Sequence, residues 1–356
     1  MSDAPTQLTS VAALVEQRLE RLFEDERNEW AAVDSRLVEA IDELERIAMG
    51  GKRLRAGYCY WAWLGASGGS EVGDLPNDLD IIDACASFEL LQAFALIHDD
   101  IMDDADMRRS ERTIHVEQAE RLEKESWRGE ARRYGEGVAL LVGDLSHVYA
   151  DQLIGNGSDQ TRSLWDRLRI ELNLGQYLDM RSAAAAELDR ETATRVATFK
   201  SAPYTIVRPL QLGASVAGPV SPELVEQLAR YGTPAGQAFQ LRDDLLGVLG
   251  NESRAGKPVG NDLREGKPTE LVAVALERAD DAQKRVLDGI GMPDLGADQT
   301  AAIIEILHAT GAVDEIEMRI EKLIRDATVV ADALPFDQRV RETLTVFAVY
   351  VAARHH

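Results

Sequence analysis

Apolar residues recur at every third or fourth position through much of this chain, which is the spacing of amphipathic helices. The pattern is clear over residues 11–47 and returns in seven further stretches, which are Ile81–Ile101, Gly137–Leu153, Thr161–Met180, Glu191–Leu212, Pro222–Leu249, Ala301–Thr310 and Val313–Leu334. No stretch shows a convincing alternation of apolar and polar residues, and no rhythm of alternating strands and helices is present. The sequence therefore predicts an all-α protein.

Glycine, proline and polar residues separate these stretches at 65–76, 155–159, 218–222 and 250–268. Residues 117–133 are highly charged and are compatible with a solvated helix, a loop or an insertion. Because no linker and no internal repeat divides the sequence, we expect one large helical domain over residues 1–356.

The composition gives enough apolar material for a sizeable core, since 45% of the 356 residues are hydrophobic. The chain has 39 Lys and Arg against 62 Asp and Glu, a formal net charge of −23. Nucleic-acid backbones and anionic membrane surfaces would be repelled, which excludes them as main partners. A small anion can still bind where cationic side chains gather.

The two cysteines, Cys59 and Cys85, are too few for a disulfide framework and show no zinc-ligand spacing with histidine. No signal-peptide pattern opens the chain. The most apolar stretches, 81–97 and 344–353, are interrupted by charges or too short to cross a bilayer. We therefore expect a soluble, cytoplasmic protein without stable membrane insertion.

An acidic cluster follows the apolar run 90–97 and holds five carboxylates in eight residues, namely Asp99, Asp100, Asp103, Asp104 and Asp106. Carboxylates four residues apart share a helical face and repel one another, so a positive group should compensate them. Because the cluster continues a helix too apolar to be exposed, it is expected at the rim of a cavity. Its hard oxygen ligands indicate Mg²⁺ or a related cation and not zinc.

A second acidic pair, Asp243 and Asp244, follows another apolar helical segment, 236–242. Two such clusters on separate helices can face each other across a bundle and hold several divalent cations. That arrangement suits a diphosphate substrate, which the protein's own negative charge would otherwise repel.

Basic residues near glycines complete the pattern. Lys52 and Arg55 lie in the segment Gly50–Arg55, three residues apart, and share a face if Gly51 leads into a helix. Further cations are Arg108, Arg109, Lys200, Lys257 and Lys267. Each alone is commonly only a favourable partner of a helix dipole, but the set indicates an anion-binding site.

Taken together, these motifs resemble those of the trans-isoprenyl diphosphate synthases, also called polyprenyl synthetases. The resemblance covers a core of about residues 50–270 and rests on Gly50–Arg55, Gln92, Leu96–Asp103, Arg108–Arg109, Thr113–His115, Gly143–Asp144, Gly175–Gln176, Asp179, Lys200–Ser201, Gly236–Gln240, Asp243–Asp244, Gly256–Lys257, Asp262 and Gly266–Lys267. It implies a single helical bundle of the isoprenoid synthase type with a central substrate cavity, and a homodimer.

The resemblance also implies a metal site with about three Mg²⁺ ions, for which Mn²⁺ can substitute. Asp99 and Asp103 would bind two of these ions and Asp243 the third, all bridging an allylic diphosphate. The supporting carboxylates would be Asp100, Asp179 and Asp244.

Two diphosphate groups are bound in this family, and the resemblance assigns residues to each. Isopentenyl diphosphate, which sits without metal, would contact Lys52, Arg55, Gln92 and Arg109. The allylic diphosphate would contact Arg108, Lys200, Gln240 and Lys257, with Lys267 closing the site from a mobile loop. Metal and cations would stabilise the departing diphosphate, while dipoles near Lys200, Ser201 and Gln240 steady the allylic cation. The released diphosphate is a plausible base for the final proton loss.

The chain departs from the family pattern at three positions. Gly247 stands where the second acidic motif normally has a third Asp, which is expected to weaken the third metal site while Asp243 remains. Ser201 replaces a usual Thr and keeps the hydroxyl, and Ala56 stands where Pro is common.

Product length in the family is limited by an aromatic ring at the floor of the elongation tunnel. Phe94 beside the small Ala95 resembles the pattern of geranylgeranyl (C20) synthases. Farnesyl (C15) or longer products are the alternatives, and Phe94 could also be an ordinary core aromatic. No ligand or base role is assigned to His98, His115 or His147.

Three other functions would account for only part of these motifs. A class I terpene cyclase would need an Asn/Ser/Glu metal motif, which the segment after Asn261 does not supply, and would have no use for an isopentenyl pocket. A non-catalytic partner subunit would be expected to lose ligands that this chain retains. Plain storage of divalent cations leaves the cationic residues without an explanation.

Overall fold

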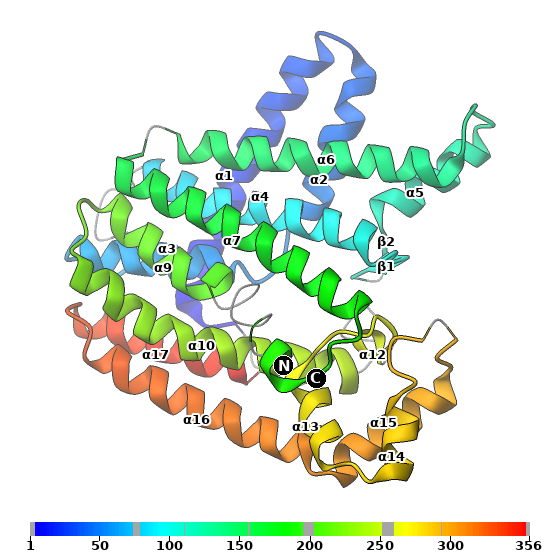
Figure 1. The fold of residues 1–356 in the computed structure, drawn as a ribbon. Coiled ribbons are helices and arrows are strands. Elements are labelled where there is room, and N and C mark those ends of the chain that lie inside the picture. Colours follow the sequence, from blue (N-terminus) through cyan, green and yellow to red (C-terminus); the bar gives the residue numbers. More distant parts are fainter. Residues whose placement is uncertain are drawn as a thin grey trace. The chain divides into compact units, whose positions relative to one another are not determined.

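The computed structural model describes residues 4–73, 79–109, 111–155, 157–193, 195, 203–250, 260–292 and 294–353. Within these residues the chain is almost entirely helical (Figure 1), which confirms the all-α prediction. Three residues assigned from the sequence, Lys200, Ser201 and Lys257, lie outside the described residues.

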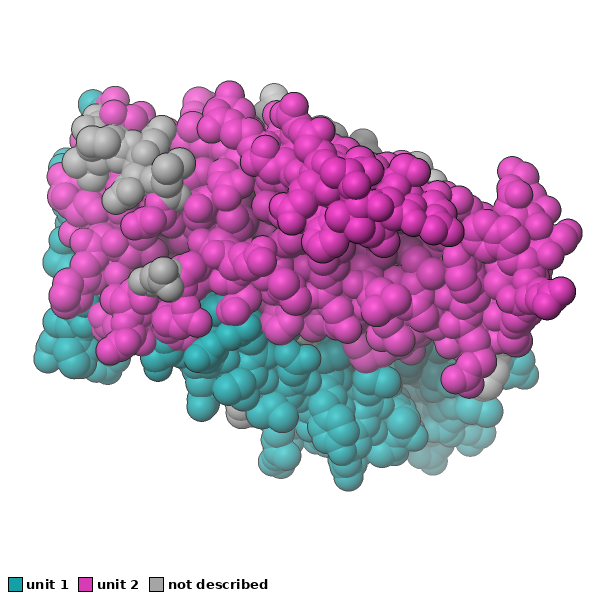
Figure 2. Space-filling model, turned by 90° about the horizontal axis from the view of Figure 1, so that it is seen from above, with its two compact units in different colours: residues 1–3, 163–211, 220–356 teal, residues 4–162, 212–219 magenta. Residues whose placement is uncertain are grey.

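The chain divides into two compact units, coloured separately in Figure 2. One unit, called the N-terminal unit here, comprises residues 4–162 and 212–219. The other, called the C-terminal unit, comprises residues 163–211 and 220–356 together with the first three residues. The expectation of one continuous domain stays a prediction.

The N-terminal unit is built around one apolar helix, α4, which packs against α6, α3, α1 and α2. Helix α4 carries the buried core residues Phe88, Leu90 and Leu91, each 0% exposed. The elements of this unit are α1 (Thr6–Ala31), η1 (Ser35–Leu37), α2 (Val38–Ala48), α3 (Leu54–Ala66), α4 (Leu79–Met102), β1 (Met107–Arg108), β2 (Glu111–Arg112), α5 (Ile114–Lys124) and α6 (Ala131–Ile154).

The C-terminal unit has α10 at its centre, packed against α16, α17, α13 and the π-helical turn η2. Arg242 ties three of these helices together, because its guanidinium donates to Glu317 of α16 at 2.5 and 2.6 Å and to the carbonyl of Ala352 in α17 at 2.8 Å. The elements are α7 (Asp159–Ala184), which begins in the N-terminal unit, η2 (Pro203–Val207), α9 (Arg208–Val216), which ends there, α10 (Pro222–Leu249), α12 (Asn261–Arg264), α13 (Glu270–Arg278), α14 (Asp281–Leu287), α15 (Ala297–Ala309), α16 (Ala312–Asp332) and α17 (Gln338–Ala352).

Capping residues explain where the long helices begin. The Ser221 side chain accepts a hydrogen bond from the backbone N–H of Leu224, and Pro222 occupies the first turn, so α10 begins where the sequence predicts. The Glu130 side chain caps α6 in the same way and separates it from α5. The charged segment 117–133 is therefore the end of one helix, a turn and the beginning of the next.

The expectation of no strands needs a small correction. Met107–Arg108 and Glu111–Arg112 pair as an antiparallel ladder of two residues each. Strands this short show no alternation that a sequence pattern could reveal.

Helix α4 also corrects the expectation that its apolar stretch could not span a bilayer. By length and composition Asp80–Met102 could cross a membrane, and it is the one helix of the described residues that could. However, 72% of its most apolar window is buried inside the protein, as in the core helix of a soluble protein.

Candidate active site

The first acidic cluster lies at the C-terminal end of α4. The backbone N–H of Asp103 donates to the carbonyl of Asp99 at 2.8 Å, so the two aspartates are one helical turn apart. Asp99 and Asp103 are half-buried, whereas Asp100 is 4% exposed. Asp99 and Asp103 therefore present two accessible carboxylates beside the buried Asp100, and the remaining members of the cluster, Asp104 and Asp106, are exposed.

Arg108 supplies the positive charge that the crowded aspartates require. Its Nε donates to both carboxylate oxygens of Asp100, at 2.7 and 2.8 Å, and its Nη2 lies 3.6 Å from Asp99. Burial disfavours the guanidinium charge, but the hydrogen bond to Asp100 and the nearby carboxylates outweigh it and raise the pKa of Arg108. The predicted compensation is confirmed, and in this structure Arg108 acts on the acidic cluster itself.

The short hairpin after α4 brings Arg108 back to the helix end. Asp104 has a left-handed φ of 49° that turns the chain, and the N–H of Ala105 donates to the carbonyl of Asp100 at 2.9 Å. The hydroxyl of Thr113 donates to the carbonyl of Ala105 at 2.7 Å and fixes the second strand of the hairpin. Local backbone geometry thus places the cation.

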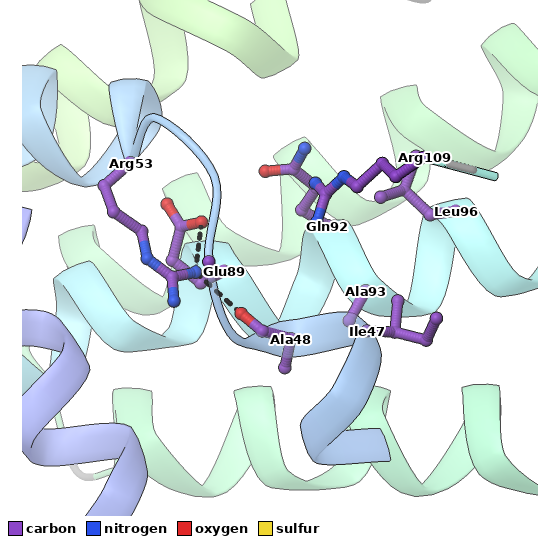
Figure 3. Close-up of a pocket in the computed structure, with 9 residues that line it drawn as sticks. Ile47, Ala48, Arg53, Glu89, Gln92, Ala93, Leu96 and Arg109 are labelled. Atoms are coloured by element: carbon purple, nitrogen blue, oxygen red, sulfur yellow. Dashed lines mark hydrogen bonds and ion pairs between the residues drawn. The ribbon is translucent and has the colours of Figure 1, made fainter. Parts of the chain in front are cut away.

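A second group of predicted residues meets in a small cavity of the N-terminal unit (Figure 3). The cavity, of about 10 Å³, is lined by Gly50 and Arg53 of the loop after α2, by Glu89 and Gln92 of α4, and by Arg109, with Ile47, Ala48, Ala93 and Leu96 completing the wall. The sequence assigned Gln92 and Arg109 to one pocket with this loop, and the structure brings them together.

Arg109 stands close to the glycines of the loop. A Cβ atom on Gly51 would lie 3.5 Å from Nη2 of Arg109, so the guanidinium approaches the bare backbone. Partial burial of this guanidinium, followed by the like charges of Arg108 and Arg53, lowers the pKa of Arg109. A bound anion would relieve this crowding of positive charge.

Lys52 and Arg55 do not share a helical face as the sequence suggested. Helix α3 begins at Leu54, so Lys52 belongs to the preceding loop, where its side chain is exposed. Arg55 lies in the first turn of α3 and is half-buried.

The second acidic cluster lies near the C-terminal end of α10. Asp243 is exposed and Asp244 is 8% exposed, and Nε2 of Gln240 donates to Oδ1 of Asp244 at 2.6 Å. Burial, followed by the negative charge of Asp262 and then of Asp243, raises the pKa of Asp244 well above its usual value. This part of α10 therefore brings several carboxylates close together.

Asp262 reaches this cluster from α12. A Cβ atom on Gly247 would lie 2.6 Å from Cγ of Asp262 and closer still to its Oδ2. The other oxygen, Oδ1, lies 3.8 Å from Nζ of Lys267, which also pairs with Glu265. The glycine at the position of the expected third Asp thus has a carboxylate packed directly over it.

The donors in both clusters are carboxylate oxygens, which suit a hard divalent cation. In the part of the chain that the structure describes, no three His, Cys, Asp or Glu side chains are arranged to hold a metal ion by themselves. The carboxylates gathered around Asp244 nonetheless fit a cation, since positive charge would lower the cost of burying Asp244.

The candidate tunnel residue Phe94 is 8% exposed and contacts two histidine rings. Its ring centroid is 4.7 Å from that of His98 and 4.8 Å from that of His147 on α6. A Cβ atom on Gly143 would overlap the His98 ring, so α6 needs a glycine there. Ala95 is half-buried on the same helix.

Comparison with known proteins decides the family. The model of the family described as polyprenyl synthetase matches residues 37–310. The chain belongs to the polyprenyl synthetase family. Its enzyme class is therefore that of the trans-prenyltransferases.

Individual relatives agree with this family. The structure of geranylgeranyl pyrophosphate synthase from Corynebacterium glutamicum, complexed with isoprenyl diphosphate and magnesium, is 36% identical and superimposes with a TM-score of 0.90 over 98% of this chain and 99% of that chain. The geranylfarnesyl diphosphate synthase of Aeropyrum pernix is 31% identical over 321 residues, which cover 87% of this chain and 92% of that protein. Heptaprenyl diphosphate synthase component 2 of Geobacillus stearothermophilus is 28% identical over 98% of this chain and 97% of its own length.

Sequence reasoning about this polyprenyl synthetase missed three side chains that the structure places at the site. Arg53 and Glu89 form a buried pair in the cavity wall, and Asp262 packs over Gly247. Glu89 gave a usable signal, since a charge inside so apolar a helix needs a buried partner. Asp262 was quoted in the resemblance, but no local pattern tied it to Gly247.

Proposed function

We propose that this polyprenyl synthetase condenses isopentenyl diphosphate with an allylic diphosphate in the cytoplasm, giving geranylgeranyl diphosphate and diphosphate. The observation that carries the proposal is the pairing, within one unit, of two different anion-binding environments. Accessible carboxylates at the end of α4 suit a metal-bound diphosphate, while Gly50, Gln92 and Arg109 line a separate cavity whose one carboxylate, Glu89, is paired with Arg53.

The carboxylates are proposed to hold about three Mg²⁺ ions, with Mn²⁺ as a substitute. Asp99 and Asp103 would hold two ions and Asp243 the third, with Asp100, Asp179 and Asp244 as supporting carboxylates. When bound, the metal neutralises the diphosphate and lowers the cost of its departure. The magnesium in the Corynebacterium glutamicum relative supports the use of Mg²⁺.

The cations are proposed to separate the two substrates. Lys52, Arg55, Gln92 and Arg109 would bind isopentenyl diphosphate through direct hydrogen bonds to its phosphate oxygens. The allylic diphosphate would take the remaining contacts, from Arg108, Lys200, Gln240, Lys257 and Lys267. Dipoles near Lys200, Ser201 and Gln240 would steady the allylic cation.

The reaction breaks the allylic carbon–oxygen bond, and the bonding electrons leave with diphosphate. The double bond of isopentenyl diphosphate then forms the new carbon–carbon bond, and a proton passes to the released diphosphate. Because charge develops on the leaving group, fixed cations and bound metal lower the barrier most.

The C20 product length is proposed from Phe94. Contacts with the rings of His98 and His147 fix the position of this aromatic ring, which supports its role as the floor of the tunnel. The relatives themselves are named for several product lengths, including geranylgeranyl and geranylfarnesyl diphosphate.

A homodimer is also proposed. Helix α6 exposes Leu141 and Val148, which are 70% and 52% accessible and lie two turns apart. Helix α7 exposes Ile170, Leu174 and Tyr177 on one face. Such apolar faces are suited to burial against a second copy. Light scattering coupled to gel filtration would measure the mass directly, and a monomer at micromolar concentration would contradict the dimer.

The decisive experiment is a product assay of the purified protein alone with labelled isopentenyl diphosphate. Dimethylallyl, geranyl and farnesyl diphosphates are supplied in turn, with Mg²⁺ and then with a chelator. We expect label in a C20 product with Mg²⁺ and none after chelation. Cyclised products without label would indicate a terpene cyclase. No product from the protein alone would favour a subunit that needs a partner. The Geobacillus stearothermophilus relative is itself named as component 2 of a synthase.

A further inference from the structure

The loop that carries Lys52 has an unusual backbone. Gly50, Gly51 and Arg53 all have left-handed φ values, of 79°, 90° and 50°. Glycine adopts this region freely, but an arginine does so only when its surroundings compensate for the strain. The turn leaves Lys52 exposed and directs Arg53 into the protein, where it is 2% exposed.

The Arg53 side chain joins three segments of the N-terminal unit (Figure 3). Its Nη1 donates to the carbonyl of Ala48 at 2.7 Å and to Oε2 of Glu89 at 3.0 Å. Ala48 is the last residue of α2, where a carbonyl has no partner within the helix and a cation is favoured. One guanidinium therefore fixes the end of α2, its own loop and α4.

Burying this ion pair costs more free energy than filling the same space with apolar side chains. Glu89 is 5% exposed, and its Oε1 and Nη2 of Arg53 are buried without a hydrogen-bond partner, while Nε of Arg53 has only a longer ion pair, of 3.8 Å, with Glu16 of α1. Apolar residues of similar size would pack there at no such cost. A pair that does not improve stability suggests a role in placing other groups.

The groups that it can place are those of the isopentenyl pocket. Gln92 follows Glu89 by one turn of α4, and Arg109 lines the same cavity as Arg53. At about 10 Å³ this cavity is far too small for a diphosphate. The substrate must therefore lie outside it, at the exposed rim where Gly51, Lys52 and Arg109 are accessible.

We propose that Arg53 and Glu89 are positioning residues for isopentenyl diphosphate, which hold the loop so that Lys52 and Arg109 meet the same phosphate group. The inference rests on the proposed function, since it presumes that this rim binds that substrate. Neither residue touches the substrate, and neither acts on the allylic diphosphate.

The test compares two double variants. Arg53→Met with Glu89→Leu removes the pair without leaving a buried charge, so the protein should still fold. Arg18→Met with Asp83→Leu is the matched control, because Asp83 also lies on α4 and pairs with Arg18 at 2.5 Å. Circular dichroism and the thermal midpoint check the folding of both. Arg53→Lys serves as a second variant, since it keeps the charge but loses the planar fork.

Binding of isopentenyl diphosphate is measured by calorimetry in the presence of a chelator, so that no metal or turnover is involved. We expect the Kd to rise about 10- to 100-fold in Arg53→Met/Glu89→Leu, less in Arg53→Lys, and to stay unchanged in the control. In the Mg²⁺-loaded enzyme, KM for isopentenyl diphosphate should rise while KM for the allylic substrate does not.

The outcomes separate this inference from the proposed function. If the wild-type protein fails to bind isopentenyl diphosphate, the proposed pocket is wrong and the positioning role falls with it. Wild-type affinity in both Arg53 variants would overturn the positioning role alone. An equal loss of affinity in the Arg18 control would also overturn it, because the effect would then be general.

Discussion

The carboxylate of Asp262 occupies the space that a side chain at Gly247 would need. Cγ of Asp262 lies 2.6 Å from the place where a Cβ atom on this glycine would stand. The family's third motif carboxylate therefore does not fit on α10 with Asp262 in this position. Instead α12 places a carboxylate beside Asp244, whose pKa it helps to raise. The position of Asp262 therefore requires a glycine at position 247.

Gly247→Ala should destabilise the protein by about 1–3 kcal/mol, because the added methyl group must displace the carboxylate of Asp262. Urea unfolding followed by circular dichroism measures the change. Gly137→Ala is the matched control, since this glycine lies inside α6 and its Cβ would meet nothing within 4 Å. That control should gain about 0.5–1 kcal/mol from helix propensity. Equal stability of the two variants would show that Asp262 does not fill the space over Gly247.

Arg108→Met should cost about 3–5 kcal/mol of unfolding free energy, because it leaves the carboxylate of Asp100 buried without its partner. The side chains of the pair are 16% and 5% exposed, so solvent screens them little. Adding Asp100→Leu to Arg108→Met should restore most of the stability in the same urea titration. If the double variant were no more stable than Arg108→Met, the cost would not come from the unpaired carboxylate.

Phe94→Ala should lengthen the product beyond that of the wild type, since it removes the ring that contacts His98 and His147. Chromatography of the dephosphorylated products measures the chain length. Phe88→Ala is the control, because Phe88 is a fully buried ring on the same helix. Both variants should lose about 3–5 kcal/mol of stability, but only the first should change the product. The same product distribution in Phe94→Ala and wild type would remove Phe94 from the tunnel floor.

Much of the fold follows from local patterns in the sequence. Helix α10 has the predicted bounds because Ser221 and Pro222 give a clear beginning and Gly250 an end. Helix α3 was missed because almost all of its residues 54–66 are buried, so no polar face marks the helical period. Helix α5 was left open because its charges mask a short amphipathic pattern.

In the site, too, the sequence predicts features that depend on neighbouring residues but not contacts between residues far apart in the chain. The aspartates at the end of α4 and the need for a compensating cation could be inferred from spacing alone. Arg108 reaches the aspartates because a hairpin with strands of two residues turns the chain back toward α4. Strands this short leave no periodic pattern in the sequence. The relations of Arg53 to Glu89 and of Gly247 to Asp262 join separate elements, and only the folded chain brings them together.

Asp99→Asn and Asp103→Asn should each lower kcat by about 10²–10³ and raise the Mg²⁺ concentration needed for half-maximal rate, because each removes negative charge from the accessible end of α4. Asp104→Asn is the control, since this exposed aspartate lies in the following left-handed turn, where it is 3.5 Å from Arg132. Initial rates across a Mg²⁺ titration separate loss of metal affinity from loss of turnover. Asp100→Asn should behave differently from both, because Asp100 is committed to Arg108, so its loss should reduce stability more than the apparent Mg²⁺ affinity. An equal Mg²⁺ dependence in Asp99→Asn and Asp104→Asn would mean that the accessible carboxylates of α4 do not hold the metal.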